Sequence, residues 1–80
     1  MGWYVYILEC SDTTYYTGIT TDIERRIDEH TAGIGAKYTK GRGPLKLMYQ
    51  EEYTDRSSAS KREIEIKSLS KAQKFSLISR

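Results

Sequence analysis

The sequence predicts a single α+β domain over residues 1–80, in which a small sheet packs against helices. Its length suits one domain with one core. Two segments rich in aromatic and branched residues near the N-terminus predict a β-hairpin, and later segments combine helical spacing with capping residues. With 38% hydrophobic and 30% charged residues, the composition is typical of an ordinary folded protein.

The first predicted elements are two paired strands. Residues 3–8, WYVYIL, lack polar alternation, which predicts a strand that is covered on both faces and central in the sheet. The turn-forming residues CSDTT follow, and YYTGIT at 15–20 predicts a second, antiparallel strand. Gly18 is unusual inside a strand, because such a glycine often marks a bulge or a close approach by a ligand or another backbone.

The next predicted element is a helix at about residues 22–32. Thr21 or Asp22 can cap its start, two isoleucines line its core side, and Gly33 follows its end. Residues 33–44, GIGAKYTKGRGP, form a basic, glycine-rich loop that is too long and too particular for a plain connector.

A third strand and two further helices complete the predicted order. LKLMYQEEY predicts a strand at about 45–53, whose pairing partner in the sheet stays open. Asp55 or Ser57 can cap a second helix that runs to about Leu69, and Ser70 can start a final helix. The residues expected inside that final helix are Phe75, Leu77 and Ile78.

Charge is distributed unevenly, although the formal net charge is only +2. Residues 37–46 hold four basic residues and no acid: Lys37, Lys40, Arg42 and Lys46. Residues 61–80 hold six basic residues against Glu63 and Glu65. Clustered lysine and arginine suit a phosphate backbone, and the alternative is an ordinary solvated surface.

Several classes of function lack the residues they need. One cysteine and one histidine, Cys10 and His30, exclude an internal disulfide and a cysteine-rich zinc site. No Gly-x-Ser-x-Gly elbow or Walker loop is present. We expect a cytoplasmic protein without a membrane partner, because no apolar run approaches roughly 18 residues and the N-terminus lacks the order of a signal peptide.

The first predicted helix separates its two adjacent arginines. At about 100° per residue, Arg26 shares a line with Asp22 and His30, whereas Arg25 points away. Arg26 and His30 are therefore predicted to face whatever lies beside the sheet. Spacing alone favours a simpler interpretation, in which Asp22 and Arg26 form an exposed ion pair and His30 merely ends the helix.

The second predicted helix offers two glutamates, and the helical wheel does not choose between them. Glu63 lies on the side of the apolar stripe and can pair with Lys67, whereas Glu65 borders Leu69. A single carboxylate suits a Mg²⁺ ion that keeps several waters and binds through a substrate phosphate. It does not suit a high-affinity metal cage.

The order of these residues resembles the GIY-YIG nuclease superfamily. YVY is followed about ten residues later by YTG, and Arg26 comes ten residues after Tyr16. The likeness covers essentially the whole chain and is closest to short, stand-alone, uncharacterised bacterial members, which are also similar in GAKYTKGRGPLKLMY. The chain is similar, too, to the nuclease domains of the bacterial nucleotide-excision-repair endonuclease, of group I intron homing endonucleases and of a eukaryotic structure-specific endonuclease.

The resemblance implies a three-stranded antiparallel sheet flanked by helices. It also implies hydrolysis of a DNA phosphodiester with one weakly bound divalent ion, Mg²⁺ or Mn²⁺. In this likeness Tyr16 deprotonates or orients the attacking water, and Tyr6 supports it or positions the phosphate. Arg26 would stabilise charge in the transition state, His30 matches an auxiliary histidine, and Glu63 matches the metal-binding glutamate.

Two structural conditions accompany these roles. Tyr6 and Tyr16 can serve one site only if the hairpin register, or a bulge at Gly18, places them on one face. A free tyrosine has a pKa near 10, so a phenolate needs positive charge from Arg26, Lys37 or the metal. Otherwise the tyrosines pack in the sheet with surface hydroxyls. The residues expected to contact nucleic acid are Gly18, which would admit substrate to the backbone, and Lys37, Lys40, Arg42 and Lys67.

The chain departs from the family pattern in three places. Tyr4 stands where the motif's name has glycine, Thr17 stands for the usual branched residue, and there is no asparagine, which many members carry in the C-terminal helix of the site. Three functions stay open. They are a structure-preferring, metal-dependent DNA endonuclease in DNA repair or processing, a nucleic-acid-binding module with little or no catalysis, and an adaptor for a protein partner, which could also supply substrate targeting.

Overall fold

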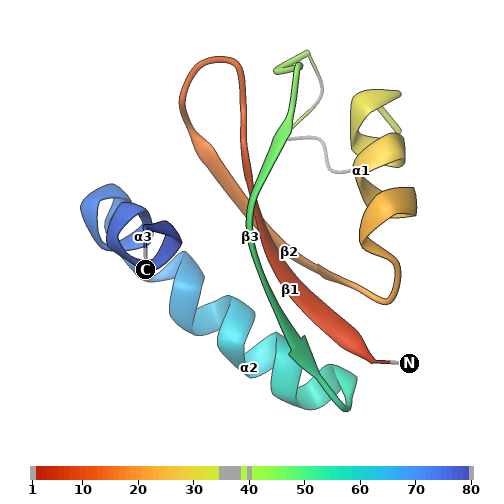
Figure 1. The fold of residues 1–80 in the computed structure, drawn as a ribbon, viewed down its shortest axis with the longest axis vertical. Coiled ribbons are helices and arrows are strands. Elements are labelled where there is room, and N and C mark those ends of the chain that lie inside the picture. The colour runs from red at the N-terminus through yellow and green to blue at the C-terminus, as the bar shows by residue number, and fades with distance from the viewer. Residues whose placement is uncertain (1, 35–38, 40, 80) are drawn as a thin grey trace.

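The chain forms one three-stranded antiparallel sheet with helices on both faces. A computed structural model describes residues 2–34, 39 and 41–79. The strands are β1 (Trp3–Glu9), β2 (Tyr15–Thr20) and β3 (Lys46–Tyr53), in the spatial order β2-β1-β3 (Figure 1). The predicted central position of the first strand is confirmed, and β3 pairs antiparallel with β1, which the sequence left open.

Three capped helices complete the α+β fold. They are α1 (Ile23–Thr31), α2 (Arg56–Lys67) and α3 (Lys71–Ile78). Each is preceded by a side chain that accepts a backbone N–H three residues on: Asp22, Asp55 and Ser70. All three caps were among those predicted. None of these helices is long and apolar enough to cross a membrane, within the residues that the structure describes.

The main core lies between the sheet and the pair α2 and α3, which Figure 1 shows on the side of the sheet opposite α1. Its buried members are Val5, Ile7, Ala59, Ile66 and Leu77. Leu77 and Ile78 supply the contact of α3 with this core. The expectation that Phe75 lies inside is wrong, because its side chain points away from the core and is 59% exposed.

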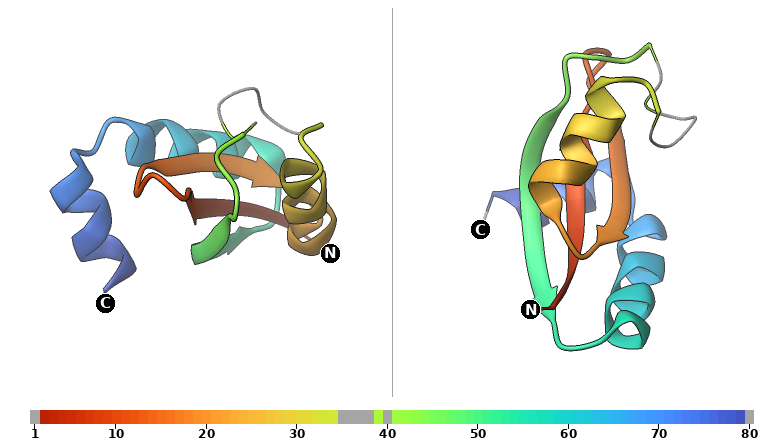
Figure 2. Two further views of the ribbon diagram at one scale, coloured as in Figure 1. Left: turned by 90° about the horizontal axis from the view of Figure 1, so that it is seen from above. Right: turned by 90° about the vertical axis from the view of Figure 1, so that its right-hand side faces the viewer.

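The register of β1 and β2 brings the two tyrosines to one face. Tyr6 lies opposite Gly18, and Leu8 lies opposite Tyr16. Because alternate residues of a strand share a face, Tyr6 and Tyr16 point to the same side of the sheet. No bulge at Gly18 is needed, since the ladder between β1 and β2 is regular there. Figure 2 shows α1 lying across one face of the sheet, and the contacts of His30 identify it as the face that holds Tyr6 and Tyr16.

The segment after α1 returns to the β1 to β2 turn before it enters β3. Gly33, with a φ of 79°, follows the helix, and its N–H donates to the carbonyl of His30. The backbone N–H of Ser11 donates to the Arg42 carbonyl at 2.8 Å, and the Arg42 guanidinium pairs with Asp12. These two contacts therefore anchor the loop that follows α1 to the turn between β1 and β2.

Candidate active site

Two tyrosines, a histidine and an arginine converge between α1 and the hairpin. The ring centroids of Tyr6 and Tyr16 lie 6.4 Å apart, and those of Tyr16 and His30 lie 5.2 Å apart. Arg26 donates a hydrogen bond to the Tyr6 hydroxyl. The structure thus brings together all four residues that the sequence predicted for catalysis. His30 does not merely end its helix, because only 2% of it is exposed.

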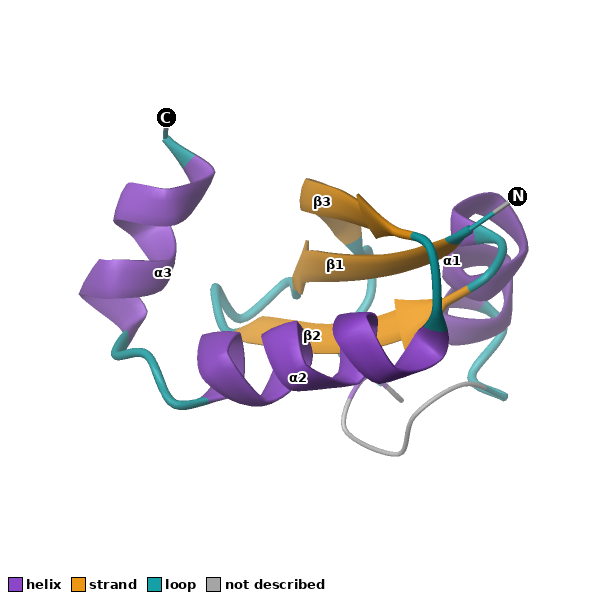
Figure 3. Cartoon of the chain, turned by 90° about the horizontal axis from the view of Figure 1, so that it is seen from below, coloured by secondary structure: helices purple, strands orange, loops and turns teal. Residues whose placement is uncertain are grey.

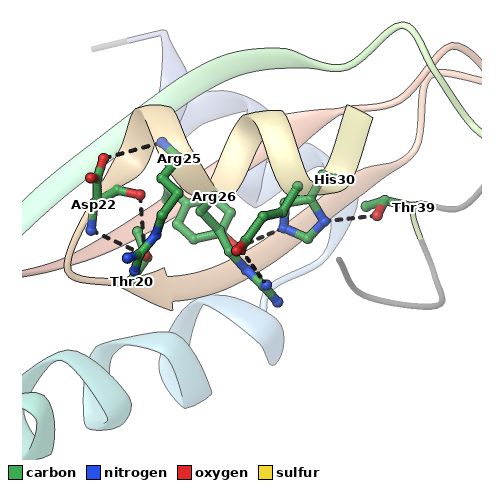
Figure 4. A network of polar contacts seen from close by, with 8 residues as sticks. Thr20, Asp22, Arg25, Arg26, His30 and Thr39 are labelled. Atoms are coloured by element: carbon green, nitrogen blue, oxygen red, sulfur yellow. Dashed lines mark hydrogen bonds and ion pairs between the residues drawn. The ribbon is translucent and has the colours of Figure 1, made fainter. Parts of the chain in front are cut away.

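A buried chain of hydrogen bonds runs from β1 through α1 to the loop. The Tyr6 hydroxyl lies 2.9 Å from Nε2 of His30, and Nδ1 of His30 lies 2.8 Å from Oγ1 of Thr39 (Figure 4). All three side chains are buried. With both ring nitrogens engaged, the imidazole of His30 is held in one orientation. Thr39 therefore ties the loop to the tyrosine.

Arg26 has a different partner from the one that helical spacing suggested. Its guanidinium donates to the Glu29 carboxylate at 3.0 Å, whereas Asp22 accepts from the backbone N–H of Arg25 (Figure 4). The exposed pair of Asp22 with Arg26 is therefore not formed, because capping the helix occupies Asp22. Arg26 is half-buried between Glu29 and Tyr6, so part of its guanidinium stays accessible from solvent.

Burial decides the protonation of the two innermost groups. Tyr6 is 1% exposed, and burial raises its pKa to about 12 although the hydrogen bond from Arg26 acts in the opposite direction. Burial, and then the charge of Arg26, lower the pKa of His30 below its ordinary value. At neutral pH Tyr6 is a neutral phenol and His30 a neutral imidazole. The expectation that nearby positive charge favours a phenolate is not met at Tyr6.

Gly18 makes room for the Tyr6 side chain. A Cβ atom at Gly18 would lie 2.6 Å from the Tyr6 hydroxyl oxygen and 2.8 Å from its Cζ. The close approach expected at this glycine is thus made by the chain's own tyrosine. A contact between Gly18 and nucleic acid stays a prediction.

The structure separates the two glutamates that the helical wheel left equal. The charge of Glu63 acts on Tyr6, where it adds to the rise in pKa. The Glu63 side chain is 20% exposed and lies 3.3 Å from the Lys67 ammonium. Glu65, in contrast, is 66% exposed and lies 3.7 Å from Arg62, which pairs with Glu51 of β3. Geometry therefore favours Glu63 as the carboxylate of the site.

The donor set fits one weakly held divalent ion. Within the described residues, no three side chains of the types His, Cys, Asp and Glu gather as a metal cluster would require. The Glu63 carboxylate already forms an ion pair with one cation, the Lys67 ammonium. One carboxylate suits Mg²⁺ or Mn²⁺ whose other ligands are water and phosphate oxygens.

The basic residues that were predicted to contact nucleic acid differ in what the structure describes of them. Arg42 pairs with Asp12, so part of its role is to hold the loop on the hairpin turn. The hydrogen bond from Thr14, followed by the contacts of Arg42, lowers the pKa of the Asp12 carboxyl. Lys37 and Lys40 lie outside the described residues. Contacts of these three residues and of Lys67 with nucleic acid stay predictions.

Sequence analysis missed two residues of the site, Glu29 and Thr39. Glu29 follows Arg26 by three residues, which is a spacing at which helical side chains meet, so this signal was available. Thr39 lies in an irregular loop, where no periodicity distinguishes a buried threonine from an exposed one.

Comparisons with known proteins point to the same family that the site residues resemble. The model of the GIY-YIG family, described as the GIY-YIG catalytic domain, matches residues 2–76. A UPF0213 protein of Halobacterium salinarum is 57% identical over 74 residues, which are 92% of this chain and 96% of the relative. A UPF0213 protein of Staphylococcus haemolyticus is 53% identical over 75 residues, which are 94% of this chain and 92% of the relative.

Two solution NMR structures share the fold. The UPF0213 protein BH0048 from Bacillus halodurans is 49% identical, with a TM-score of 0.64 over 99% of this chain and 84% of that one. The protein EF2693 from E. faecalis is 38% identical, with a TM-score of 0.68 over the same shares. The α+β arrangement of a three-stranded sheet and helices is thus common to these chains.

Proposed function

Because this chain belongs to the GIY-YIG family of catalytic domains, we propose that it is a metal-dependent endonuclease that hydrolyses DNA phosphodiester bonds. One observation carries the proposal. Tyr6, Tyr16, Arg26 and His30 converge on one face of the sheet, although they come from three separate elements. Titratable groups that gather in this way and have shifted pKa values mark a candidate functional site.

The two tyrosines take different roles in this proposal. Tyr6 is buried and stays protonated, so it positions Arg26 and His30 rather than accepting a proton from water. Tyr16 is half-buried on the same face and can reach a solvent molecule. Tyr16 is thus the residue that deprotonates or orients the attacking water.

Arg26 contacts the phosphate. Its guanidinium is fixed by the Tyr6 hydroxyl and by Glu29, so little side-chain freedom is left to lose when substrate binds. The planar fork of donors can stabilise the negative charge that develops on the phosphate oxygens. The neutral His30 keeps the Tyr6 hydroxyl in place through the bond to Nε2.

Glu63 would hold the divalent ion, Mg²⁺ or Mn²⁺. Such an ion supplies positive charge to the phosphate during the reaction. When the ion is not bound, Lys67 neutralises the Glu63 carboxylate. Because the Lys67 side chain is exposed, its ammonium can turn to a substrate phosphate instead.

The preferred substrate in this proposal is branched, flapped or single-stranded DNA. The domain spans about 31 × 28 × 19 Å, so it contacts only a short stretch of substrate. A structure that exposes unpaired nucleotides would bring the reacting phosphate to a small site more readily than a closed duplex. A role in DNA repair or processing in the cytoplasm, with a targeting protein partner, belongs to the same proposal.

A cleavage assay with paired glutamate variants tests the reaction. The parent chain should nick flapped DNA with Mg²⁺ or Mn²⁺ and leave it intact with a chelator. Glu63→Gln should reduce the rate at least about 100-fold, because a neutral amide binds a divalent ion poorly. Glu65→Gln is the matched control on the same helix and should cut normally. If Glu63→Gln cuts as fast as the parent, the proposed reaction is wrong.

One observation favours a second function, nucleic-acid binding with little or no catalysis. The Lys67 ammonium already compensates the carboxylate that would hold the metal. In that case DNA binds in a salt-dependent way, but no divalent ion produces nicks in branched, flapped or single-stranded DNA.

A further inference from the structure

Thr39 is a buried residue of the loop between α1 and β3, and it contacts the candidate active site from inside the protein. Because its side chain is buried, it does not touch a bound DNA strand, and the proposed reaction gives it no role. Its hydroxyl oxygen nevertheless lies 2.8 Å from Nδ1 of His30. Figure 4 shows the imidazole of His30 between Arg26 and Thr39. Thr39 can therefore act on the reaction only through His30.

The position of Thr39 is fixed from the turn between β1 and β2. The backbone N–H of Arg42 donates to the Thr39 carbonyl at 3.1 Å, and the Arg42 carbonyl accepts from the N–H of Ser11 at 2.8 Å. The Arg42 guanidinium also pairs with Asp12 of the same turn. These contacts hold the Thr39 hydroxyl against the imidazole ring.

The hydrogen bonds of Tyr6 determine which nitrogen of His30 carries the proton. A guanidinium group has donors only, so the Tyr6 oxygen accepts the bond from Arg26. Because Tyr6 is buried, its own hydroxyl hydrogen needs an acceptor inside the protein. Nε2 of His30, at 2.9 Å, is that acceptor, and it can accept only when it carries no proton. The proton of the neutral imidazole therefore sits on Nδ1.

The Nδ1–H group of His30 then needs an acceptor of its own. The hydroxyl oxygen of Thr39 has lone pairs for this bond and lies at the right distance. The opposite tautomer would direct Nε2–H at the Tyr6 oxygen, and the Tyr6 hydroxyl hydrogen would lose its acceptor. The bonds at the two ends of the imidazole thus favour the same tautomer.

We propose that Thr39 is a positioning residue for the reaction. By accepting from Nδ1–H, Thr39 holds His30 in the tautomer that accepts from the Tyr6 hydroxyl. The Tyr6 oxygen then keeps its lone pairs turned to Arg26, so the guanidinium stays aimed at the substrate phosphate. The effect on catalysis rests on the proposed function, whereas the tautomer of His30 can be measured without DNA.

Long-range proton-nitrogen NMR spectra of the imidazole test the assigned tautomer. His30 is the single histidine, so an untagged, isotope-labelled chain gives one imidazole, whose protonated nitrogen is identified by its chemical shift. At neutral pH the parent and Thr39→Ser should carry the proton on Nδ1. Thr39→Val removes the acceptor and should raise the share of the Nε2–H form severalfold. A parent spectrum dominated by Nε2–H overturns the proposal without any variant, and a Thr39→Val spectrum equal to that of the parent does so as well.

Cleavage kinetics on flapped DNA test the effect on the reaction. Thr39→Val should lower kcat about tenfold and leave KM unchanged, because the buried side chain acts on the site without touching substrate. Thr39→Ser should cut like the parent. In a Tyr6→Phe background Thr39→Val should cost much less, because its effect passes through the Tyr6 hydroxyl. Losses that add in full, or a rise in KM alone, would contradict the positioning role.

Thr17→Val is the matched control, because it makes the same change at another buried threonine. Thr17 lies opposite Ile7 of the main core, on the side of the sheet along which Figure 3 shows α2. Its hydroxyl has no hydrogen-bond partner among the described residues, so Thr17→Val should leave the His30 tautomer and kcat unchanged. If the tautomer responds to Thr39→Val as predicted while the parent cuts no DNA, the placement of Tyr6 by Thr39 is supported and the proposed reaction fails. If the tautomer does not respond, the inference fails whether or not the chain cuts DNA.

Discussion

Replacing Gly18 by alanine probes how tightly the Tyr6 hydroxyl is held. The new Cβ atom would lie 2.6 Å from the Tyr6 oxygen, 2.8 Å from its Cζ and 3.2 Å from Cε2 of Tyr16. Carbon and oxygen atoms that are not bonded to each other do not lie this close, so the tyrosine or the backbone would have to move. Tyr6 cannot simply swing away, because it is buried and its hydroxyl bonds to His30 and Arg26.

The expected cost follows from overpacking. Forcing extra carbon into a well-packed site costs about 1 to 3 kcal/mol. For a domain of this size each kcal/mol lowers Tm by roughly 4 to 8 °C. Tyr6→Phe should cost about 1 to 2 kcal/mol, because the buried His30 nitrogen loses its partner. In the double variant the nearest clash has gone, so the combined loss should fall short of the sum by at least about 0.5 kcal/mol.

Urea and thermal unfolding, followed by circular dichroism, measure these values. Gly43→Ala is the matched control, because a Cβ atom at Gly43 meets nothing within 4 Å, and it should change the free energy of unfolding by less than about 0.5 kcal/mol. The packing argument is refuted if Gly18→Ala behaves like Gly43→Ala. It is refuted equally if the losses of Gly18→Ala and Tyr6→Phe add in full.

Three further predictions concern the same site. Since the pKa of His30 is lowered in the folded state, the unfolded chain takes up its proton first, so the free energy of unfolding should fall as the pH drops below about 6.5, by at most about 1.4 kcal/mol per pH unit; a flat profile there would contradict it. Thr39→Val should lose about 1 to 2 kcal/mol in urea unfolding, because Nδ1 of His30 is left unpaired, whereas Thr39→Ser should not; equal losses would count against the hydrogen bond. Lys67→Gln should tighten Mn²⁺ binding severalfold in NMR relaxation titrations, because Lys67 competes for Glu63; unchanged affinity would remove that competition.

Local signals in the sequence predicted the elements well. Asp22, Asp55 and Ser70 cap the helices because short-range hydrogen bonds decide where a helix begins. The unbroken apolar run of the first strand predicted its central place in the sheet, because only a strand covered on both faces tolerates such a run.

Long-range placement was harder to predict. Nothing local decided whether Tyr6 and Tyr16 share a face, because one residue of register reverses the answer. The burial of Thr39 likewise depends on segments far away in the chain. Phe75 was misplaced because α3 is short and offers the core only one edge.

The resemblance to a known family supplied the site residues, and the physical structure refined their roles. Arg26, for example, was singled out by motif spacing, but its bond to Tyr6 explains how it is held. This hydrogen bond lowers the pKa of Tyr6, but burial raises that pKa by more, so the tyrosine stays protonated. Roles within a site thus depend on burial, which a motif does not encode.

The most direct test of the proposed active site compares the two adjacent arginines. Arg26 bonds to Tyr6 inside the site, whereas the adjacent Arg25 is exposed, so the same substitution at the two positions separates the site from general charge. With Mg²⁺ and flapped DNA, Arg26→Ala should cut about 100- to 1,000-fold more slowly than the parent with its fold retained, and Arg25→Ala should cut normally. Equal cleavage rates for the two variants would contradict an active site at Tyr6, Tyr16 and Arg26.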